Sequence, residues 1–210
     1  PFRTVREIDI GFARAQCVRI TYMGELGYEL YVPSEQAVHV YDRLVEEGEN
    51  HGLKHAGLRA LGSLRLEKAY RDYGHDIDNT DNAFETGLGF AVALDKQGGF
   101  IGQEAAKAQK AAAPFKRRLV QVLVNDPEPM LWHAEIIHRD GVAVGYVRAG
   151  SYGHTLGGAV GLAMIEGGDQ PITADYFKTG TWEIEINGAF YPCKCSLQPM
   201  YDPKMERIKA

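Results

Sequence analysis

Residues 22–29, with the sequence YMGELGYE, form the segment with the clearest potential for chemistry. Gly24 and Gly27 allow the backbone to turn sharply and to approach a ligand closely. Glu29 follows in a strand pattern that is otherwise apolar, and a carboxylate in such a strand usually has a charged partner or a ligand. The pattern is equally consistent with a ligand site and with an ordinary hairpin in which the carboxylate pairs with an arginine.

Arg59 and Arg65 are the candidate partners for Glu29, and both lie in a helix predicted over residues 56–70. Arg65 and Lys68 are expected on a strip of the helix surface beside its apolar stripe. A guanidinium there could hold a ligand carboxylate through two parallel hydrogen bonds. The commoner alternative is an ion pair on the helix surface.

Residues 72–78, DYGHDID, place carboxylates, Tyr73 and His75 in one loop. Paired carboxylates suggest acid–base chemistry or a cation site, but the pattern alone favours an Asx-rich turn. Cys193 and Cys195 point to one side of a predicted strand. No further ligands stand near them in sequence, so structural cysteines are favoured and no metal site is predicted.

The bulk composition narrows the class of protein. The 210 residues carry a net charge of −5, which argues against a nucleic-acid-binding protein. No apolar run approaches the roughly 20 residues that span a membrane. Three cysteines in no disulfide pattern indicate a reducing compartment, either the cytoplasm or, in a eukaryote, the mitochondrial matrix. The first residue is Pro1 rather than Met, so we expect a chain that is processed or cut from a longer one.

The first part of the chain mixes strands and helices. Residues 15–33 are expected to form two strands around the glycine turn, with alternating side chains at residues 18–22 in the first and with Glu29 and Tyr31 on one face of the second. Ser34 is expected to cap a helix whose apolar residues recur at helical spacing. A further strand is expected at residues 90–94, and a surface helix over residues 102–113.

After residues 112–116 the pattern changes to short strands with tight turns. Asp140-Gly141 and Asn187-Gly188 are hairpin signals. Several short strands at even spacing indicate a small antiparallel barrel or sandwich. The predicted fold is therefore α+β, with a mixed part over residues 1–112 and an all-β part over residues 113–210.

Three stretches of the first part resemble the glycine cleavage T-protein (aminomethyltransferase) superfamily. They are TYMGELGYELYVP at residues 21–33, AGLRALGSLRLE at residues 56–67 and YRDYGHDID at residues 70–78. The resemblance continues in order to Asp202-Pro203, so it covers nearly the whole chain. It implies a partial folate-binding, T-protein-like α+β domain followed by the family's C-terminal β-barrel domain.

Within the superfamily, the sequence is most similar to the C-terminal modules of dimethylglycine and sarcosine dehydrogenases. Residues 130–133 and 152–158 especially resemble the regulatory subunit of pyruvate dehydrogenase phosphatase. By this resemblance the chain looks N-terminally incomplete. An FAD-containing domain is expected to precede it in a longer parent protein and to be its partner.

The resemblance also implies a tetrahydrofolate site. In the family, the tyrosine that matches Tyr22 packs against the folate, and the glutamate that matches Glu29 hydrogen-bonds the pterin ring. An arginine in the position of Arg65 lies near the anionic glutamyl tail, and Tyr73 is assigned to the same cofactor-binding site. No catalytic residue is assigned, because the family's catalytic aspartate lies in an upstream segment that these 210 residues do not contain. In addition, residues 60–63, ALGS, replace an Arg-Asp pair common in T-proteins.

Three functions are compatible with this resemblance. The leading hypothesis is a module that passes a one-carbon unit from an FAD-dependent N-methyl amino acid dehydrogenase to tetrahydrofolate. One alternative is a non-catalytic regulatory module like the phosphatase subunit. The other is a T-protein-like aminomethyltransferase that needs a lipoyl carrier protein as its partner.

Overall fold

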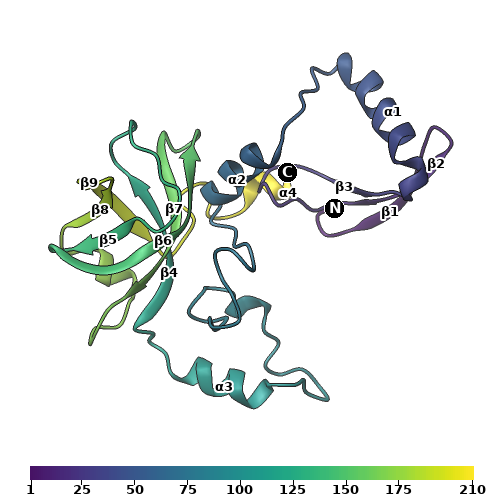
Figure 1. Ribbon diagram of the computed structural model, residues 1–210. Helices are drawn as coiled ribbons and strands as arrows, with labels where there is room; N and C mark the ends of the chain where they lie inside the picture. The colour runs from purple at the N-terminus through teal and green to yellow at the C-terminus, as the bar shows by residue number, and fades with distance from the viewer. The chain divides into compact units, whose positions relative to one another are not determined.

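A computed structural model describes all 210 residues, and the chain packs into two compact units. The first unit comprises Pro1–Arg65 together with Lys204–Ala210, and the second comprises Leu66–Pro203. The elements of both are labelled in Figure 1. None of the helices is long and apolar enough to cross a membrane.

The first unit contains a three-stranded antiparallel sheet with β2 in its centre. A strand before the glycine turn is confirmed by β2, but it ends at Val18, so Ile20 and Tyr22 lie beyond it and residues 22–26 form bends. The first strand of the sheet was not predicted at all. The strands are β1 (Val5–Ile10), β2 (Ala13–Val18) and β3 (Glu29–Tyr31).

Helix α1 (Ala37–Glu49) confirms the helix predicted after residue 34, but the cap predicted at Ser34 is wrong. The side chain of Ser34 makes no capping hydrogen bond, because residues Ser34–Gln36 form a 3-10 turn with backbone hydrogen bonds of its own. Only Val40 of the helix is buried. The apolar side chains at the predicted spacing are exposed by 72%, 53% and 43% at Val38, Tyr41 and Leu44. The other helices of this part are α2 (Leu58–Glu67), which is shorter than predicted, and α4 (Glu206–Lys209).

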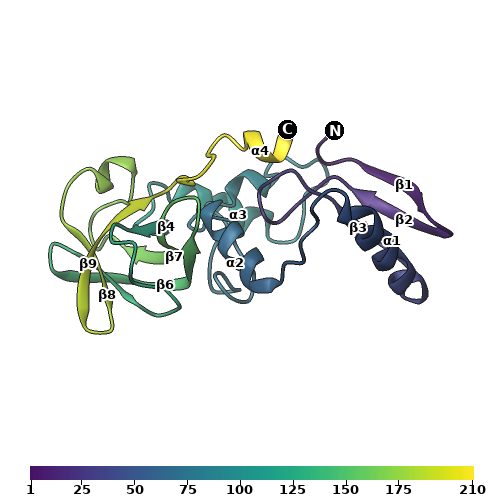
Figure 2. The ribbon, with the colours of Figure 1, turned by 90° about the horizontal axis from the view of Figure 1, so that it is seen from above.

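The second unit is built around a closed antiparallel β-barrel with the strand order β4-β7-β6-β5-β8-β9 (Figure 1 and Figure 2). This confirms the predicted barrel rather than the sandwich. Both hairpin signals are confirmed as well, because both residues of Asp140-Gly141 and of Asn187-Gly188 have positive φ, as type I′ turns require. The strands are β4 (Arg117–Val124), β5 (Ile136–Arg139), β6 (Val142–Gly153), β7 (Gly158–Glu166), β8 (Trp182–Ile186) and β9 (Ala189–Ser196).

Strand β7 explains how this unit is stabilised, because eight of its nine residues are buried. Its inner face contributes Ala163 and Ile165 to the core inside the barrel. Its outer face contributes Leu162 and Met164 to a second apolar cluster, which includes Leu66 from the end of α2. A strand covered on both faces reads as a continuous apolar run rather than an alternating one, which is how residues 159–165 read in the sequence.

The segment between α2 and the barrel consists mainly of turns. Helix α3 (Gln103–Ala111) confirms the predicted surface helix. The strand predicted at residues 90–94 is wrong, because Gly89–Ala91 form a 3-10 turn whose backbone groups bond locally instead of joining a sheet. The compact units divide the chain elsewhere, at Arg65, and a domain boundary at residue 112 remains a prediction.

Candidate functional site

The turn region that follows β2 is held in place by a buried arginine. Arg19 is only 6% exposed. Its guanidinium donates to the carbonyl oxygen of Gly27 at 3.2 Å and to the carbonyl oxygens of Ile208 and Ala210 at 3.0 Å each. These bonds fix the far end of the turn, where the chain enters β3. The half-buried Tyr22 therefore lies in an irregular but supported segment rather than on a strand.

Glu29 is the first residue of β3 and pairs in register with Val18 of β2. Its Oε2 accepts a hydrogen bond of 2.9 Å from the hydroxyl of Tyr31, which confirms that these two residues share a strand face. That bond raises the pKa of the Tyr31 phenol. The partner is therefore a tyrosine rather than Arg59 or Arg65, and Oε1 is left for a further donor. The carboxylate is half-buried, so a ligand could reach it.

Arg65 lies in the last turn of α2, and its position differs from the expectation. The sequence predicted it on the helix surface together with Lys68, but the two residues are only 5% and 1% exposed. A buried guanidinium is costly unless its hydrogen-bonding groups are satisfied. Arg65 is therefore placed in the interior of the protein rather than in a solvated ion pair.

Tyr73 belongs to the second unit and lies in the loop after α2. Its side chain is 71% exposed. The backbone pairs with Ile77 in an isolated bridge, so the tyrosine sits on a defined tight turn. Tyr22, Glu29 and Arg65 all belong to the first unit, in which Tyr22 lies in the segment that links β2 to β3 and Glu29 begins β3.

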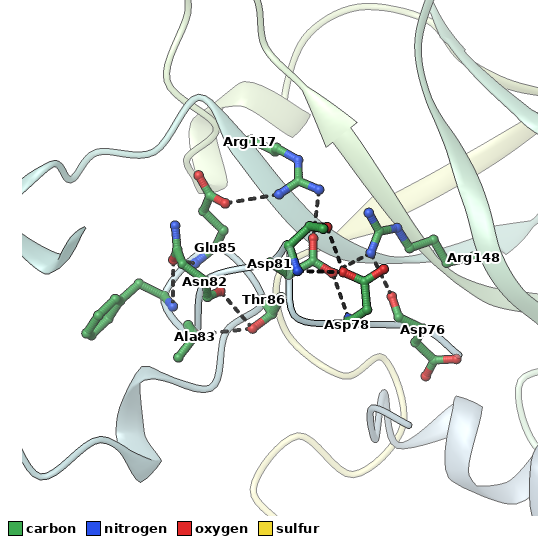
Figure 3. A network of polar contacts seen from close by, with 11 residues as sticks. Asp76, Asp78, Asp81, Asn82, Ala83, Glu85, Thr86, Arg117 and Arg148 are labelled. Atoms are coloured by element: carbon green, nitrogen blue, oxygen red, sulfur yellow. Dashed lines mark hydrogen bonds and ion pairs between the residues drawn. The ribbon is translucent and has the colours of Figure 1, made fainter. Parts of the chain in front are cut away.

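An aspartate held between two arginines anchors the Tyr73 loop to the barrel, as Figure 3 shows. Asp81 accepts hydrogen bonds from Arg117 of β4 at 2.7 Å and from Arg148 of β6 at 2.5 Å. Its side chain is only 1% exposed. Arg148 also donates to the carbonyl oxygen of Asp76 at 3.1 Å. The Asx-rich turn favoured by the sequence is confirmed, since Asp78 accepts from the backbone N–H and the hydroxyl of Thr80.

A β-bulge turns Arg148 toward this loop. Along β6, Val147 pairs with Ala163 and Ala149 pairs with Leu162, so Arg148 is the extra residue. Val147 packs inside the barrel and Ala149 packs in the outer apolar cluster. A bulge re-aims one side chain without disturbing the rest of a strand, and here it supplies a cation to the outer face of the barrel.

The C-terminal end of α2 is fixed to the barrel by two buried polar side chains. Gln121 of β4 donates to the carbonyl oxygens of Leu66 and Glu67 at 2.7 and 2.9 Å, which satisfies carbonyl groups that a helix end leaves open. Glu67 in turn accepts from the backbone N–H groups of Thr155 and Leu156 at 2.7 and 2.8 Å. The start of the Tyr73 loop is therefore held as firmly as its far end.

Two family models match consecutive parts of the chain. The model of the GCVT N-terminal domain matches residues 1–96, and the model of the glycine cleavage T-protein C-terminal barrel domain matches residues 117–202. The chain belongs to the glycine cleavage T-protein family. The stretches that resembled this family in sequence, at residues 21–33, 56–67 and 70–78, are therefore the T-protein segments that carry Glu29, Arg65 and Tyr73.

Individual relatives are much longer than this chain. The 4-methylaminobutanoate oxidase (formaldehyde-forming) of Paenarthrobacter nicotinovorans is 43% identical over 204 residues, which cover 97% of this chain and 24% of the relative. Human mitochondrial sarcosine dehydrogenase is 34% identical over 100% of this chain and 23% of its own length. The mouse regulatory subunit of pyruvate dehydrogenase phosphatase is 32% identical over 93% and 23%. The chain thus spans about a quarter of the length of these relatives.

A solved structure supports the T-protein fold. The aminomethyltransferase T of the glycine cleavage system from Bartonella henselae matches with a TM-score of 0.73 at 21% identity, over 88% of this chain and 49% of that one. At this identity the match concerns the fold alone. It agrees with the closed barrel and with the mixed first part described above.

The sequence analysis did not predict the polar residues that anchor the Tyr73 loop. Asp81 stands in a stretch rich in Asp and Asn that carried no sign of burial. Arg148 carried a signal, because it is a charged residue between the apolar residues Val147 and Ala149. Its two partners lie about seventy residues away in sequence, and only the fold brings them together.

The two cysteines of the barrel lie close together on one strand. Cys193 and Cys195 are free thiols on one face of β9, as predicted. Their mutual hydrogen bond, together with burial, raises the pKa of Cys195 well above its usual value. A thiol that keeps its proton at neutral pH is a poor nucleophile and a poor metal ligand.

Folding stability should fall in acid as Asp81 takes up a proton. Burial alone would raise the pKa of Asp81, but hydrogen bonds from Arg148, Arg117 and the backbone N–H of Asp78 lower it below its usual range. Because the folded-state pKa is the lower one, the stabilisation is complete above about pH 4 and is lost as the pH falls through the folded-state pKa. Denaturant unfolding should therefore show a steeper loss of stability below about pH 4 in the unmodified chain than in Asp81→Asn. Equal slopes would remove Asp81 as the cause.

Proposed function

We propose that this chain is the tetrahydrofolate-binding module of an FAD-dependent enzyme that oxidises N-methyl amino acids, and that the module transfers the one-carbon unit to tetrahydrofolate. Membership of the T-protein family supports the folate-binding part of the proposal. The names of two relatives support the substrate class, because 4-methylaminobutanoate and sarcosine are both N-methyl amino acids.

The segment that ends at Glu29 is the observation that carries the folate proposal. The carboxylate is half-buried and positioned by its strand register, and its Oε1 remains for a further donor. A carboxylate of this kind suits the adjacent N–H groups of a pterin ring, which it can bind through two charge-assisted hydrogen bonds. Tyr22, in the same segment, supplies an aromatic surface for stacking.

The proposal assigns Arg65 and Tyr73 to folate binding as well. The guanidinium of Arg65 suits the carboxylates of the glutamyl tail, because its planar fork matches carboxylate geometry. Tyr73 is exposed on a loop that is anchored at both ends, so its ring is available to a ligand at a low cost in conformational entropy. Bound tetrahydrofolate would supply the nucleophilic nitrogens that take up the one-carbon unit, while these residues hold and orient it.

The fate of the one-carbon unit tests this function. The complete polypeptide that contains this chain would be given an N-methyl amino acid such as sarcosine, with and without tetrahydrofolate. We expect tetrahydrofolate to suppress the release of free formaldehyde and to yield 5,10-methylenetetrahydrofolate in its place. Glu29→Ala should restore formaldehyde release without slowing substrate oxidation. Formaldehyde release that saturating tetrahydrofolate does not change would refute the proposal, and no oxidation of any N-methyl amino acid would favour a regulatory module.

A further inference from the structure

The outer wall of the barrel carries a cavity that is separate from the residues assigned to folate. It has a volume of about 640 Å³, which is in the range of small-molecule sites. About half of its lining residues are apolar or aromatic, and they come from the first half of β6, the end of β7 and the 3-10 turn at Ala174–Phe177. Its polar side contains Arg148, Arg117 and Glu166.

Arg148 differs from the other residues that line the cavity because one of its hydrogen-bond donors is buried without a partner. It is 8% exposed, and its Nη1 makes the hydrogen bonds to Asp81 and to the carbonyl oxygen of Asp76 that Figure 3 shows. Its Nε is buried and has no hydrogen-bond partner. A buried donor without a partner is uncommon in folded proteins and costs free energy. The edge of a guanidinium that contains Nε is one of the edges that bind carboxylates side-on.

The other charges around the cavity limit which anion can bind. Arg117 bonds to two carboxylates, Asp81 at 2.7 Å and Glu85 at 3.1 Å, whereas Arg148 bonds to one, the Asp81 that it shares with Arg117. Glu166 is an exposed carboxylate that lines the same cavity and repels multiply charged anions. One unsatisfied donor and one acidic neighbour therefore favour a single carboxylate over phosphate or a tricarboxylate.

The rest of the wall determines the body of the ligand. Tyr146 is 41% exposed and its ring lies 5.8 Å from the guanidinium carbon of Arg148, so an aromatic surface stands beside the unsatisfied donor. Met164 adds a polarisable thioether, a group that contacts aromatic rings favourably. Gly167 and Gly168 leave part of the wall without side chains, which allows a flat ligand to approach the backbone.

We propose that this cavity is a second ligand site, which binds a small aromatic monocarboxylate with its carboxylate on Arg148 and its ring against Tyr146. The site lies within the barrel unit and uses none of the residues assigned to folate. The proposal of this second site therefore does not depend on the proposed folate function.

The test is a titration of the 210-residue chain with 2-naphthoate, followed by the fluorescence of the probe. We expect saturable binding, and at least tenfold weaker binding of the matched neutral compound 2-naphthalenemethanol. Inorganic phosphate and citrate should not compete. Equal affinity for the acid and the alcohol would overturn the proposal, because the cavity would then be only an apolar surface, and so would the absence of saturable 2-naphthoate binding.

Variants locate the binding site. Arg148→Lys keeps a positive charge beside Asp81 but lacks the Nε donor, and should weaken 2-naphthoate binding at least tenfold. Ala143→Phe places a ring in the cavity from an exposed strand position, and should block binding even if Arg148→Lys fails to fold. Glu29→Ala serves as the control and should leave the affinity unchanged. Binding that survives Ala143→Phe and is lost in Glu29→Ala would place the probe in the proposed folate site and overturn the second site.

Discussion

Replacing Asp81 by alanine should lower the free energy of unfolding by about 3–5 kcal/mol, the range seen when one partner is removed from a buried ion pair. The carboxylate is 1% exposed and bonds to both Arg117 and Arg148. Without the carboxylate, the guanidiniums of Arg117 and Arg148 lose the negative charge that they share. Water cannot replace it well at Arg148, because that side chain is only 10% exposed. The loop that carries Tyr73 loses its attachment to β4 and β6 as a result.

Equilibrium denaturation in urea measures this effect. Asp175→Ala is the matched control, because Asp175 is exposed and pairs only with the neighbouring Lys178, so its loss should change the stability very little. Proteolysis should show the local consequence as faster cleavage within residues 72–86 of Asp81→Ala under native conditions. A stability equal to that of the control would mean that the two arginines do not depend on Asp81.

Replacing Lys68 by methionine should also cost about 3–5 kcal/mol. Lys68 is 1% exposed, and its ammonium lies 2.5 Å from the carboxylate of Asp202 and 3.2 Å from the carbonyl oxygen of the same residue. It also lies over the ring of Tyr201, at 5.4 Å from the centroid. Methionine keeps the volume but leaves the carboxylate of Asp202, which is 9% exposed, without its cation.

A double variant separates the charge from the packing. Asp202 has a positive φ of 46°, which asparagine tolerates better than most residues. Lys68→Met combined with Asp202→Asn should therefore recover part of the stability that Lys68→Met alone loses. Lys107→Met, which breaks only an exposed pair with Glu104, is the control. Additive losses in the double variant would show that the pair is not coupled.

The barrel could be predicted in detail because its signals are local. The turns at Asp140-Gly141 and Asn187-Gly188 need only two residues with positive φ, and the strands between them show their apolar runs directly. The apolar run at residues 90–94 led to a wrong strand prediction, because that prediction also rested on a local signal alone. Apolar residues alone do not distinguish a strand from a turn that bonds locally, and Phe90 is 87% exposed.

The site could be predicted only in part. The shared face of Glu29 and Tyr31 follows from the period of a strand, and the structure confirms it. The burial of Lys68 does not follow from its helix, because its partner Asp202 lies 134 residues away. The outward turn of Arg148 depends on a bulge, which is set by pairing between strands and leaves no local mark in the sequence.

The most direct test of the account is calorimetric titration of the 210-residue chain with 5-formyltetrahydrofolate. We expect saturable binding that Glu29→Ala weakens by about 10–100-fold, the range for the loss of a hydrogen bond to a charged group. Glu35→Ala, an exposed acidic residue in the 3-10 turn before α1, is the matched control and should bind like the unmodified chain. If Glu29→Ala binds as tightly as the control, or if the unmodified chain shows no saturable binding, the claim that this chain carries a folate site at Glu29 is contradicted.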